Sequence, residues 1–497
     1  MKQGTIISRT ALICALGTTS LLLASCGGGG SAPTPTSSPT PPPVVANDAP
    51  TFSSAGGASV TENATGSIYT ATGSDPDGDT LTFSISGGPD ADEFTLSGAE
   101  LSFNQTPDFE RPRDSDRNNT YDIELQVTDG RGGSATLDLS VSVFNDKEGI
   151  SVTRIAAGFD DPVSLGFLQF RGVTGLEPQG RIALAQRNGE IFEVDGTTGQ
   201  RTLMVDVFDG QPRGELLDIG FNNKGRVNFY SGLYGVVREP NGRVFIQRYS
   251  RSSIDEVELL PAGSEPVSAK LFDGVDFSNS TDFFVALSDE DGLFAQDLMS
   301  LRGKLISLEG TDPFSGASPR PGSFNTLIIG TGIRRSGGAG IIDNQILLSD
   351  QGVQIEHELN FFDQNARPLD FGWPGREGTQ GRGNNPPAAV VGPTIAYGFG
   401  TMPDQGTGAV FGGLFTGPGT ELDNAYVFGD TSGAIWSVPF DELTSGFLLR
   451  PEQMDRRRAD FEPDSAFIDS PVAFIVDDMG RLFILDSDGD LFRVDAS

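Results

Sequence analysis

The chain ends on the phrase GRLFILDSDGDLFRVD, residues Gly480–Asp495, and nearly the same phrase occurs earlier as GRIALAQRNGEIFEVD, residues Gly180–Asp195. Both copies begin with Gly-Arg, carry a second glycine at the same offset (Gly189 and Gly489) and end on Phe-x-Val-Asp. Apolar residues alternate through both halves, and Asn-Gly or Asp-Gly lies between them, where a tight hairpin turn needs positive φ. Each copy therefore predicts a strand, a turn and a second strand.

Two further stretches share parts of this phrase. NAYVFGDTSGAIWSVP has Gly433 in register, and RGKLISLEG matches the second half through Gly303. A hairpin that recurs at wide intervals indicates a propeller, because each four-stranded blade contains such a hairpin and a more variable one. Residues 149–497 have room for roughly six blades of the usual ~45–60 residues. We predict an all-β fold with a six-bladed β-propeller over 149–497, its first strand completing the last blade; an ordinary all-β sandwich is the alternative.

The composition excludes several classes of partner and of metal site. The formal charge is 34 − 68 = −34, which argues against nucleic acid and anionic membrane surfaces as partners. The negative charge suits calcium binding and export. An acidic surface that keeps the protein soluble also explains much of this charge. Cys14 and Cys26 are the only cysteines, so no disulfide framework or thiolate metal site is expected, and His357 is the only histidine.

The N-terminal segment predicts export. Residues 1–25 combine a basic start with a short apolar core, which is too short to span a bilayer comfortably. The core ends on LASC, residues 23–26, which resembles the bacterial lipobox. This implies that Cys26 becomes a lipid-anchored N-terminus of a cell-envelope protein, in the outer membrane because no Asp follows the cysteine; a plain secretory signal is the alternative. Residues 26–46 are rich in Gly, Pro, Ser and Thr and predict an extended linker.

Residues 47–148 predict a small β domain. TLTFSIS, YDIELQVTD and TLDLSVSVFN alternate apolar and polar residues over strand lengths. The motifs NDAPTF, VTEN, DPDGD, PDFE, VTD and VFND occur in the order found in a cadherin repeat, which this region resembles. The resemblance implies a calcium-binding module, and calcium is a hard cation that takes six to eight oxygen ligands.

The same resemblance implies two groups of calcium ligands, one at each end of the module. One group comprises Asp48, Asp75, Asp77 and Asp129. The other comprises Glu62, Asp108, Glu110, Asn145 and Asp146, at the end that continues into the propeller. For DPDGD taken alone, an acidic hairpin turn without a metal is the alternative.

The second half of the propeller resembles the glucose/sorbosone dehydrogenases, six-bladed propellers that use pyrroloquinoline quinone (PQQ). The resemblance rests on the phrases IGTGIRR, ILLSDQGVQIEHELNFF, LDFGWPGREG and YGFGTMPDQGTGAVFGG. It implies that backbone carbonyls of the turn at Gln351 and Gly352 hold a calcium ion that seats PQQ, with Arg334 near the quinone. Val353 replaces the proline that the family has in this turn.

The residue that would take a proton from a sugar is missing from its expected place. The family has a histidine in a phrase like HxGGxLxF, and the matching stretch here is PVSAKLFD, with Pro266 at the histidine position. His357 and Asp289 remain as candidate bases; a hydrogen-bonded blade histidine and a turn residue are the alternatives.

Two functions follow from this sequence. The favoured one is a lipid-anchored binding or adhesion protein, for a sugar or a surface protein, whose propeller has lost its catalysis. The alternative is an active PQQ- and calcium-dependent aldose dehydrogenase.

Overall fold

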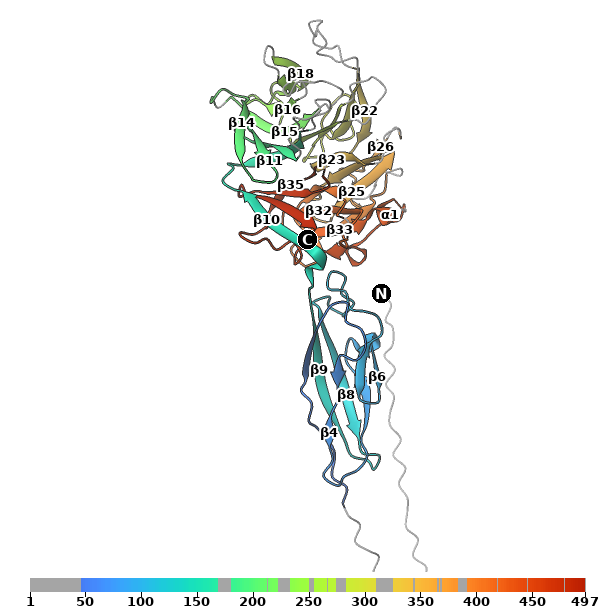
Figure 1. The fold of residues 1–497 in the computed structure, drawn as a ribbon. Coiled ribbons are helices and arrows are strands. Elements are labelled where there is room, and N and C mark those ends of the chain that lie inside the picture. The colour runs from blue at the N-terminus through green and yellow to red at the C-terminus, as the bar shows by residue number, and fades with distance from the viewer. Residues whose placement is uncertain are drawn as a thin grey trace, which may run out of the picture. The chain divides into compact units, whose positions relative to one another are not determined.

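The computed structural model, shown in Figure 1, describes residues 46–496 with internal gaps. The gaps are 169–179, 212, 222–232, 250–253, 266, 274–282, 310–324, 343–344, 364–365, 367–368, 383–390, 418, 445 and 478. The predicted targeting segment with Cys26, the linker up to residue 45, and Pro266 therefore lie outside the described residues. Among the described residues, no helix has the length and apolar character needed to cross a membrane.

The small N-terminal domain is a β-sandwich of two packed sheets and a short strand pair. One sheet has the order β2 (Gly57–Thr61), β9 (Ser134–Phe144), β8 (Thr120–Thr128) and β5 (Thr82–Gly87). The other has the order β3 (Tyr69–Thr70), β7 (Glu100–Phe103) and β6 (Phe94–Ser97), and β1 (Thr51–Phe52) pairs with β4 (Gly73–Ser74). The pairing of β2 with β9 is parallel, and the other pairings are antiparallel.

The alternation predicted from the sequence decides which residues of this sandwich are buried. Along β8, Tyr121, Ile123, Leu125 and Val127 are buried, and the polar residues between them are more exposed. Successive side chains of a strand point to opposite faces of the sheet, so these four form one apolar face. They pack with β9 residues such as Val141 in the core between the sheets.

Six four-stranded units follow and form a propeller. Their strands, from inside to outside, are as follows. Blade 1 has β11 (Pro162–Phe167), β12 (Arg181–Gln186), β13 (Glu190–Asp195) and β14 (Arg201–Asp206). Blade 2 has β15 (Glu215–Phe221), β16 (Leu233–Arg238), β17 (Val244–Tyr249) and β18 (Ile254–Leu260). Blade 3 has β19 (Ala269–Asp273), β20 (Phe283–Leu287), β21 (Lys304–Glu309) and β22 (Asn325–Thr331), extended by β26 (Leu369–Asp370).

The remaining blades have the same design. Blade 4 has β23 (Ser336–Ile342), β24 (Gln345–Asp350), β25 (Glu356–Asp363) and β29 (Ile395–Phe399), extended by β30 (Gln405–Gly406). Blade 5 has β31 (Ala409–Phe415), β32 (Ala425–Asp430), β33 (Ile435–Pro439) and β34 (Asp455–Arg456). Blade 6 has β35 (Pro471–Val476), β36 (Leu482–Asp486), β37 (Leu491–Ala496) and β10 (Ile150–Ala156). The small elements are a β27–β28 hairpin (Arg376–Glu377 and Gln380–Gly381), the helix α1 (Phe440–Leu443), and short 3-10 turns at Ala91–Glu93, Lys147–Gly149 and Pro451–Gln453.

The ring closes as the sequence predicts. The first strand of each blade contacts the first strand of the next, and β11 contacts β35. The strand β10 pairs antiparallel with β37, so the start of the propeller chain completes its last blade (Figure 1). Closure of this kind pairs the edges of the terminal blade and protects them from association with other chains.

The repeated phrases form the predicted hairpins. The two complete copies are β12–β13 and β36–β37, and the third is β32–β33. Gly189, Gly433 and Gly489 have φ of +97°, +81° and +90° at the turns. Only glycine adopts such angles without steric cost, which explains why this position is glycine in every copy.

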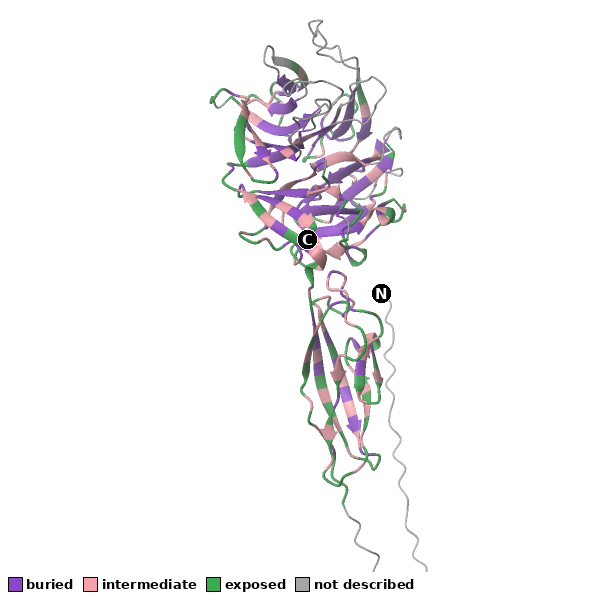
Figure 2. Cartoon of the chain, in the orientation of Figure 1, coloured by how far each residue is buried: buried purple, intermediate pink, exposed green. Residues whose placement is uncertain are grey.

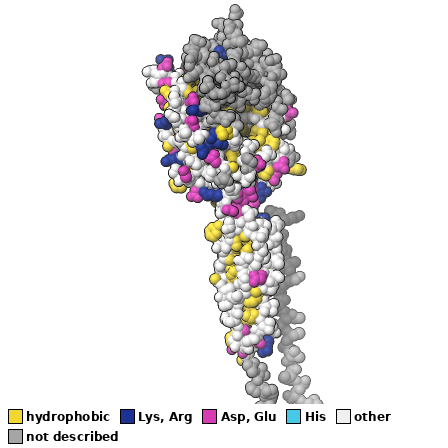
Figure 3. Space-filling view, viewed as in Figure 1, with side chains coloured by type: hydrophobic (Ala, Val, Ile, Leu, Met, Phe, Trp, Pro, Cys, Tyr) yellow, Lys and Arg dark blue, Asp and Glu magenta, His cyan; other side chains and the backbone are white. Residues whose placement is uncertain are grey.

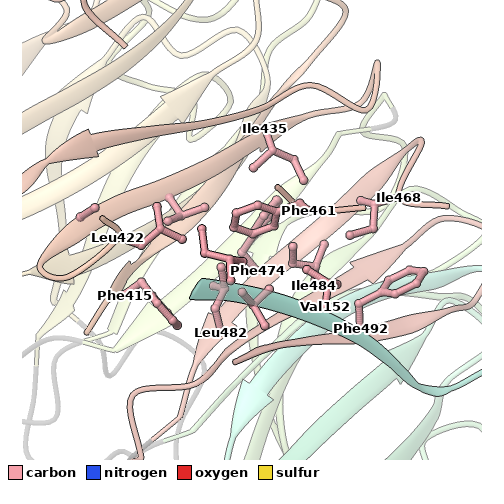
Figure 4. Packing of buried hydrophobic residues seen from close by; sticks show 14 of the residues in the cluster. Val152, Phe415, Leu422, Ile435, Phe461, Ile468, Phe474, Leu482, Ile484 and Phe492 are labelled. Atoms are coloured by element: carbon pink, nitrogen blue, oxygen red, sulfur yellow. The ribbon is translucent and has the colours of Figure 1, made fainter. Parts of the chain in front are cut away.

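The hydrophobic core of the propeller is divided among six clusters, one between each pair of adjacent blades. Figure 4 shows the cluster between blades 5 and 6, where Val152 of β10 lies with Phe474, Ile484 and Phe492. The inner strand β11 is therefore buried on both faces and reads as an apolar run, whereas the outer strand β14 is half-exposed to exposed (Figure 2). Acidic and basic side chains are interspersed on the described propeller surface visible in Figure 3.

Candidate functional site

The turn that the dehydrogenase resemblance assigns to calcium lies between β24 and β25. The Arg334 guanidinium, from the loop between β22 and β23, donates through Nη1 to the carbonyl oxygens of Gln351 at 2.7 Å and Gly352 at 3.1 Å. Burial lowers the pKa of this arginine, which nevertheless stays a cation because an arginine is protonated throughout the physiological range. The Arg334 cation therefore occupies the two carbonyl oxygens that the dehydrogenase resemblance assigns to calcium.

Buried carboxylates hold this turn and its arginine in place. Both Asp350 oxygens lie within 3.1 Å of the Arg334 backbone nitrogen, and burial raises the Asp350 pKa to about 6. Glu377 Oε1 accepts the backbone N–H groups of Val353, Gln354 and Ile355, each at 2.7 Å. The turn is thus fixed by hydrogen bonds within the protein.

The space beside the turn is small. A void of about 10 Å³, lined by residues that include Arg334, Asp350, Glu358 and Trp373, remains there. A volume of roughly 10–15 Å³ is what one water molecule requires. This void therefore has room for about one water molecule.

His357 is a structural residue in this arrangement. Its side chain is fully buried; Nδ1 accepts the Gly352 N–H at 3.1 Å, and Nε2 lies 3.0 Å from the Gly406 carbonyl oxygen. Because a carbonyl only accepts, Nε2 carries the proton and donates. Burial lowers the pKa of the imidazole, and both nitrogens are engaged, so neither is available to take a proton from a substrate.

Asp289 is also engaged within the protein. Its Oδ2 accepts the Phe294 N–H at 2.7 Å, and its Oδ1 lies 3.0 Å from an Arg302 guanidinium nitrogen. The side chain is fully buried. This geometry matches the turn-residue alternative for Asp289 and leaves no open approach to the carboxylate.

Asp218 is a buried carboxylate on an inner strand that was not among the residues predicted from the sequence. It lies on β15, is buried, and accepts the Leu271 N–H at 2.7 Å. Burial raises its pKa, while the nearby Lys270 ammonium acts in the opposite direction. Its one sequence signal is a lone carboxylate inside the apolar run ELLDIGF.

In the sandwich, the structure brings together several of the predicted calcium ligands. Carboxylate oxygens of Glu62, Glu110 and Glu148 all lie within 4.8 Å of one another. Glu62 accepts the Asp146 N–H at 2.7 Å, and Glu110 Oε1 accepts the Asn145 side-chain amide at 3.0 Å. Of the predicted set at this end, Glu62, Glu110 and Asn145 meet through their side chains, whereas Asp146 takes part through its backbone.

Asp108 stands slightly apart from this cluster. Its Oδ1 accepts the Arg111 N–H at 2.7 Å, and burial raises its pKa. Glu148 was not among the predicted ligands, although it lies two residues after the VFND motif.

The cluster holds more carboxyl groups than the neighbouring Arg457 can pair. Arg457 is 1% exposed, and its Nη1 lies 3.1 Å from Glu148 and 3.1 Å from Asp460. Glu110 is also 1% exposed, and its Oε2 has no hydrogen-bond partner among the described residues. Burial raises the pKa of Glu110 to about 10 and that of Glu148 to about 8. One arginine is thus surrounded by several carboxylates, a donor set that suits a hard cation.

A second acidic cluster lies in the DPDGD turn. Asp75, Asp77 and Asp79 also have carboxylate oxygens within 4.8 Å of one another. Asp75 Oδ1 accepts the Asp77 N–H at 2.8 Å, and Asp77 Oδ2 accepts the Asp48 N–H at 2.8 Å. Asp79, which the sequence analysis left out, lies 3.0 Å from the Arg131 guanidinium.

The fourth predicted ligand at this end belongs to a neighbouring turn. Asp129 Oδ1 accepts the backbone N–H groups of Arg131 at 2.7 Å and Gly133 at 3.0 Å. Asp48 reaches the DPDGD cluster through its backbone nitrogen in the bond to Asp77. The structure therefore places Asp75 and Asp77 together and gives Asp48 and Asp129 backbone-bonding roles.

Comparison with known proteins gives a family match for the sandwich alone. Residues 47–142 match the model of the bacterial Ig domain, a β-sandwich architecture that cadherin repeats share. No curated protein matches the chain.

Solved structures resemble the chain at low identity. The PQQ-bound aldose sugar dehydrogenase of Streptomyces coelicolor is 18% identical, with a TM-score of 0.46, over 70% of this chain and 98% of that one. A glucose dehydrogenase is 19% identical, with a TM-score of 0.48, over 70% and 100%. The calcium structure of a Trichoderma reesei carbohydrate-active enzyme of family AA12 is 15% identical, with a TM-score of 0.47, over 70% and 96%. Residues 47–142 are therefore a bacterial Ig-like domain, and the sheet topology of the chain itself shows that a six-bladed propeller follows it.

Proposed function

We propose that the protein is an exported, lipid-anchored binding protein whose propeller no longer oxidises sugars. The observation that carries this proposal is the pair of hydrogen bonds from Arg334 to the carbonyls of Gln351 and Gly352. These carbonyls are the ones that the family resemblance assigns to calcium. A propeller without this calcium lacks the support for PQQ, so a binding role is the function that remains.

The lack of an available base supports the same conclusion. A positioned base contributes typically about 10²–10⁴-fold to proton transfer, and both candidates, His357 and Asp289, are engaged in internal contacts. Two separate observations therefore support a propeller that does not oxidise sugars. Neither candidate base is available, and Arg334 occupies the carbonyl groups of the turn.

The Ig-like sandwich contributes a calcium site to this proposal. Glu62, Glu110 and Glu148 supply the carboxylate oxygens, with Asn145 and Asp460 beside them. The buried Oε2 of Glu110 accepts no hydrogen bond from a described residue and lies 3.9 Å from the Arg457 guanidinium, so it is available as a ligand for a cation. Bound calcium would neutralise the cluster and join the ends of the sandwich strands to the segment that continues into the propeller.

The alternative is an active PQQ- and calcium-dependent aldose dehydrogenase. It is favoured by the cationic surroundings of the buried Trp373, whose ring lies 5.7 Å from the Arg334 guanidinium carbon and 4.6 Å from that of Arg382. In this case Arg334 would have to leave the two carbonyls when calcium enters.

Absorbance spectroscopy tests the proposal. The full mature protein is incubated with PQQ and calcium and passed through a desalting column. We expect the protein fraction to show no PQQ absorbance. The matched variant of the candidate pocket, Trp373→Phe, should give the same result. A stoichiometric, calcium-dependent PQQ spectrum in the protein fraction would contradict the proposal.

A further inference from the structure

A pocket of about 460 Å³ lies in the propeller and shares no lining residue with the candidate calcium seat. Its walls are the loop 401–407, the turn between β32 and β33 with the start of β33, and the chain at and after β34. Small-molecule sites have volumes of roughly 300–1,000 Å³. The size of this pocket is therefore that of a site for a small ligand.

The two facing walls are joined by one buried carboxylate. Asp430 accepts the backbone N–H groups of Thr407 at 2.7 Å and Ser432 at 2.8 Å, and the Tyr397 hydroxyl at 2.9 Å. Thr407 and Ser432 both line the pocket. Because one rigid acceptor holds both walls, the pocket is formed before any ligand arrives, which lowers the entropy cost of binding.

The lining has positive charge in an acidic protein. Arg456 and Arg458 line the pocket, and no Asp or Glu does, although the chain has 68 acidic and 34 basic residues. Arg456 Nε donates to Asp404 Oδ1 at 3.0 Å, and Arg117 Nη1 donates to Asp404 Oδ2 at 2.8 Å. Two arginines therefore share the single carboxylate of Asp404. Asp430 is the nearby buried anion, and its oxygens already accept several donors.

Arg458 is the group that most directly indicates a ligand. Its side chain is exposed, and it has no hydrogen bond or ion pair with any residue that the structure describes. Burial lowers the pKa of the neighbouring Arg117, the charge of Arg456 lowers it further, and Asp404 and Glu452 act in the opposite direction. An anion that enters the pocket would meet an unpaired guanidinium, which binds carboxylates in a planar, two-bond geometry.

The rest of the lining indicates a polyhydroxylated ligand. Hydroxyl groups of Thr401, Thr407 and Ser432 and the amide of Gln405 can both donate and accept. Met402, Pro403, Ala434, Ile435 and Trp436 provide apolar surface in the same pocket. A sugar ring has both features, since it carries hydroxyl groups at its edge and C–H groups on its face.

We propose that this pocket binds a sugar acid, with the carboxylate on Arg458 and the hydroxyl groups on the Thr401, Thr407, Ser432 and Gln405 side chains. The inference rests on the binding role proposed for the propeller and names its ligand class. Two sources share this chemistry: a uronate residue of a polysaccharide and a free sugar acid. If PQQ-dependent turnover were found, the lost-catalysis proposal would fail and this site would stand.

Isothermal titration calorimetry on the full mature protein tests the site. The probes are galacturonate, glucuronate and mannuronate, each as monosaccharide and disaccharide, with the neutral hexoses as matched controls. We expect at least one uronate to bind at least tenfold more tightly than its neutral hexose, and the affinity to fall as salt is raised. Tighter binding of the disaccharide assigns the polysaccharide source, and equal binding assigns the free acid.

Variants locate the binding in this pocket. Arg458→Gln should weaken uronate binding at least tenfold, and Ser432→Ala by a smaller factor. The melting temperature of Arg458→Gln should be unchanged, because Arg458 is exposed and has no partner among the described residues. The control is Arg187→Gln in blade 1, where the arginine is half-buried and pairs with Asp161 at 2.8 Å. Absence of binding by every uronate, equal binding of the neutral hexoses, or full affinity in Arg458→Gln would overturn the inference.

Discussion

Replacing Glu110 by glutamine tests the proposed calcium site in the sandwich. The amide has nearly the shape of a protonated carboxyl group, which is the form that burial favours when no cation is present, since it raises the Glu110 pKa to about 10. Without calcium the substitution should therefore leave the stability of the sandwich unchanged or raise it. With calcium it should remove a charged ligand, and the metal-dependent stabilisation should be lost.

The expected size of the effect follows from ligand linkage. Calcium at a hundred times its dissociation constant stabilises a domain by about 2.7 kcal/mol. For a domain of about 100 residues, this corresponds to a rise in Tm of roughly 11–22 °C. The measurement is the Tm of the sandwich transition by calorimetry, in calcium and in chelator, for the wild type and Glu110→Gln.

Two control variants make the result specific. Glu124→Gln changes a carboxylate on β8 whose Oε1 accepts the Ser86 hydroxyl at 2.6 Å, a bond that the amide oxygen can keep; its calcium response should equal that of the wild type. Asp77→Asn removes a carboxylate from the second acidic cluster and separates its contribution. A wild-type transition that is the same in calcium and chelator, or a full calcium response in Glu110→Gln, would refute the reasoning.

Three further predictions concern the anchor, the charged cluster and the propeller. Cys26→Ser should move the protein from the membrane fraction to the soluble fraction, and a protein that stays with the membrane would contradict lipid anchoring. In chelator, burial raises the Glu148 pKa from 4.5 to about 8, so the folded state keeps a proton that the unfolded chain loses, and the contribution of Glu148 to the unfolding free energy should fall as pH rises between these values. The wild type minus Glu148→Gln difference in urea melts measures this contribution, and a rise over the same window would contradict it. Arg334→Gln should destabilise the propeller by about 1–3 kcal/mol, because a charged hydrogen-bond donor to two carbonyls is lost; an unchanged denaturation midpoint would show that these bonds contribute little.

The architecture was predictable because its signals are local. The phrase that ends the chain contains its own turn glycine and alternation, so each copy specifies a hairpin without reference to the rest of the molecule. The prediction that the first strand completes the last blade is confirmed by the pairing of β10 with β37. The alternation in YDIELQVTD likewise predicted which side chains fill the sandwich core.

The sequence could not predict which atoms of the candidate sites are engaged by other groups of the protein, because these contacts join residues that are distant in the chain. Gln351 and Gly352 match the family's calcium turn by sequence, and only the fold brings the Arg334 guanidinium onto their carbonyls. The same holds for Arg457, which lies 309 residues from Glu148 in the chain and 3.1 Å from it in space. His357 was a candidate base by elimination, and the carbonyl of Gly406, 49 residues away, engages its Nε2.

The most direct test of the lost-catalysis claim is a turnover assay. The full mature protein is reconstituted with PQQ and calcium and given a panel of aldoses with an artificial electron acceptor, and the rate is compared with that of free PQQ under the same conditions. We predict a rate equal to that of free PQQ for every sugar, because Arg334 holds the calcium seat and His357 has no free nitrogen. Aldose oxidation above the free-PQQ rate that disappears in chelator would contradict the account and identify the protein as an active dehydrogenase.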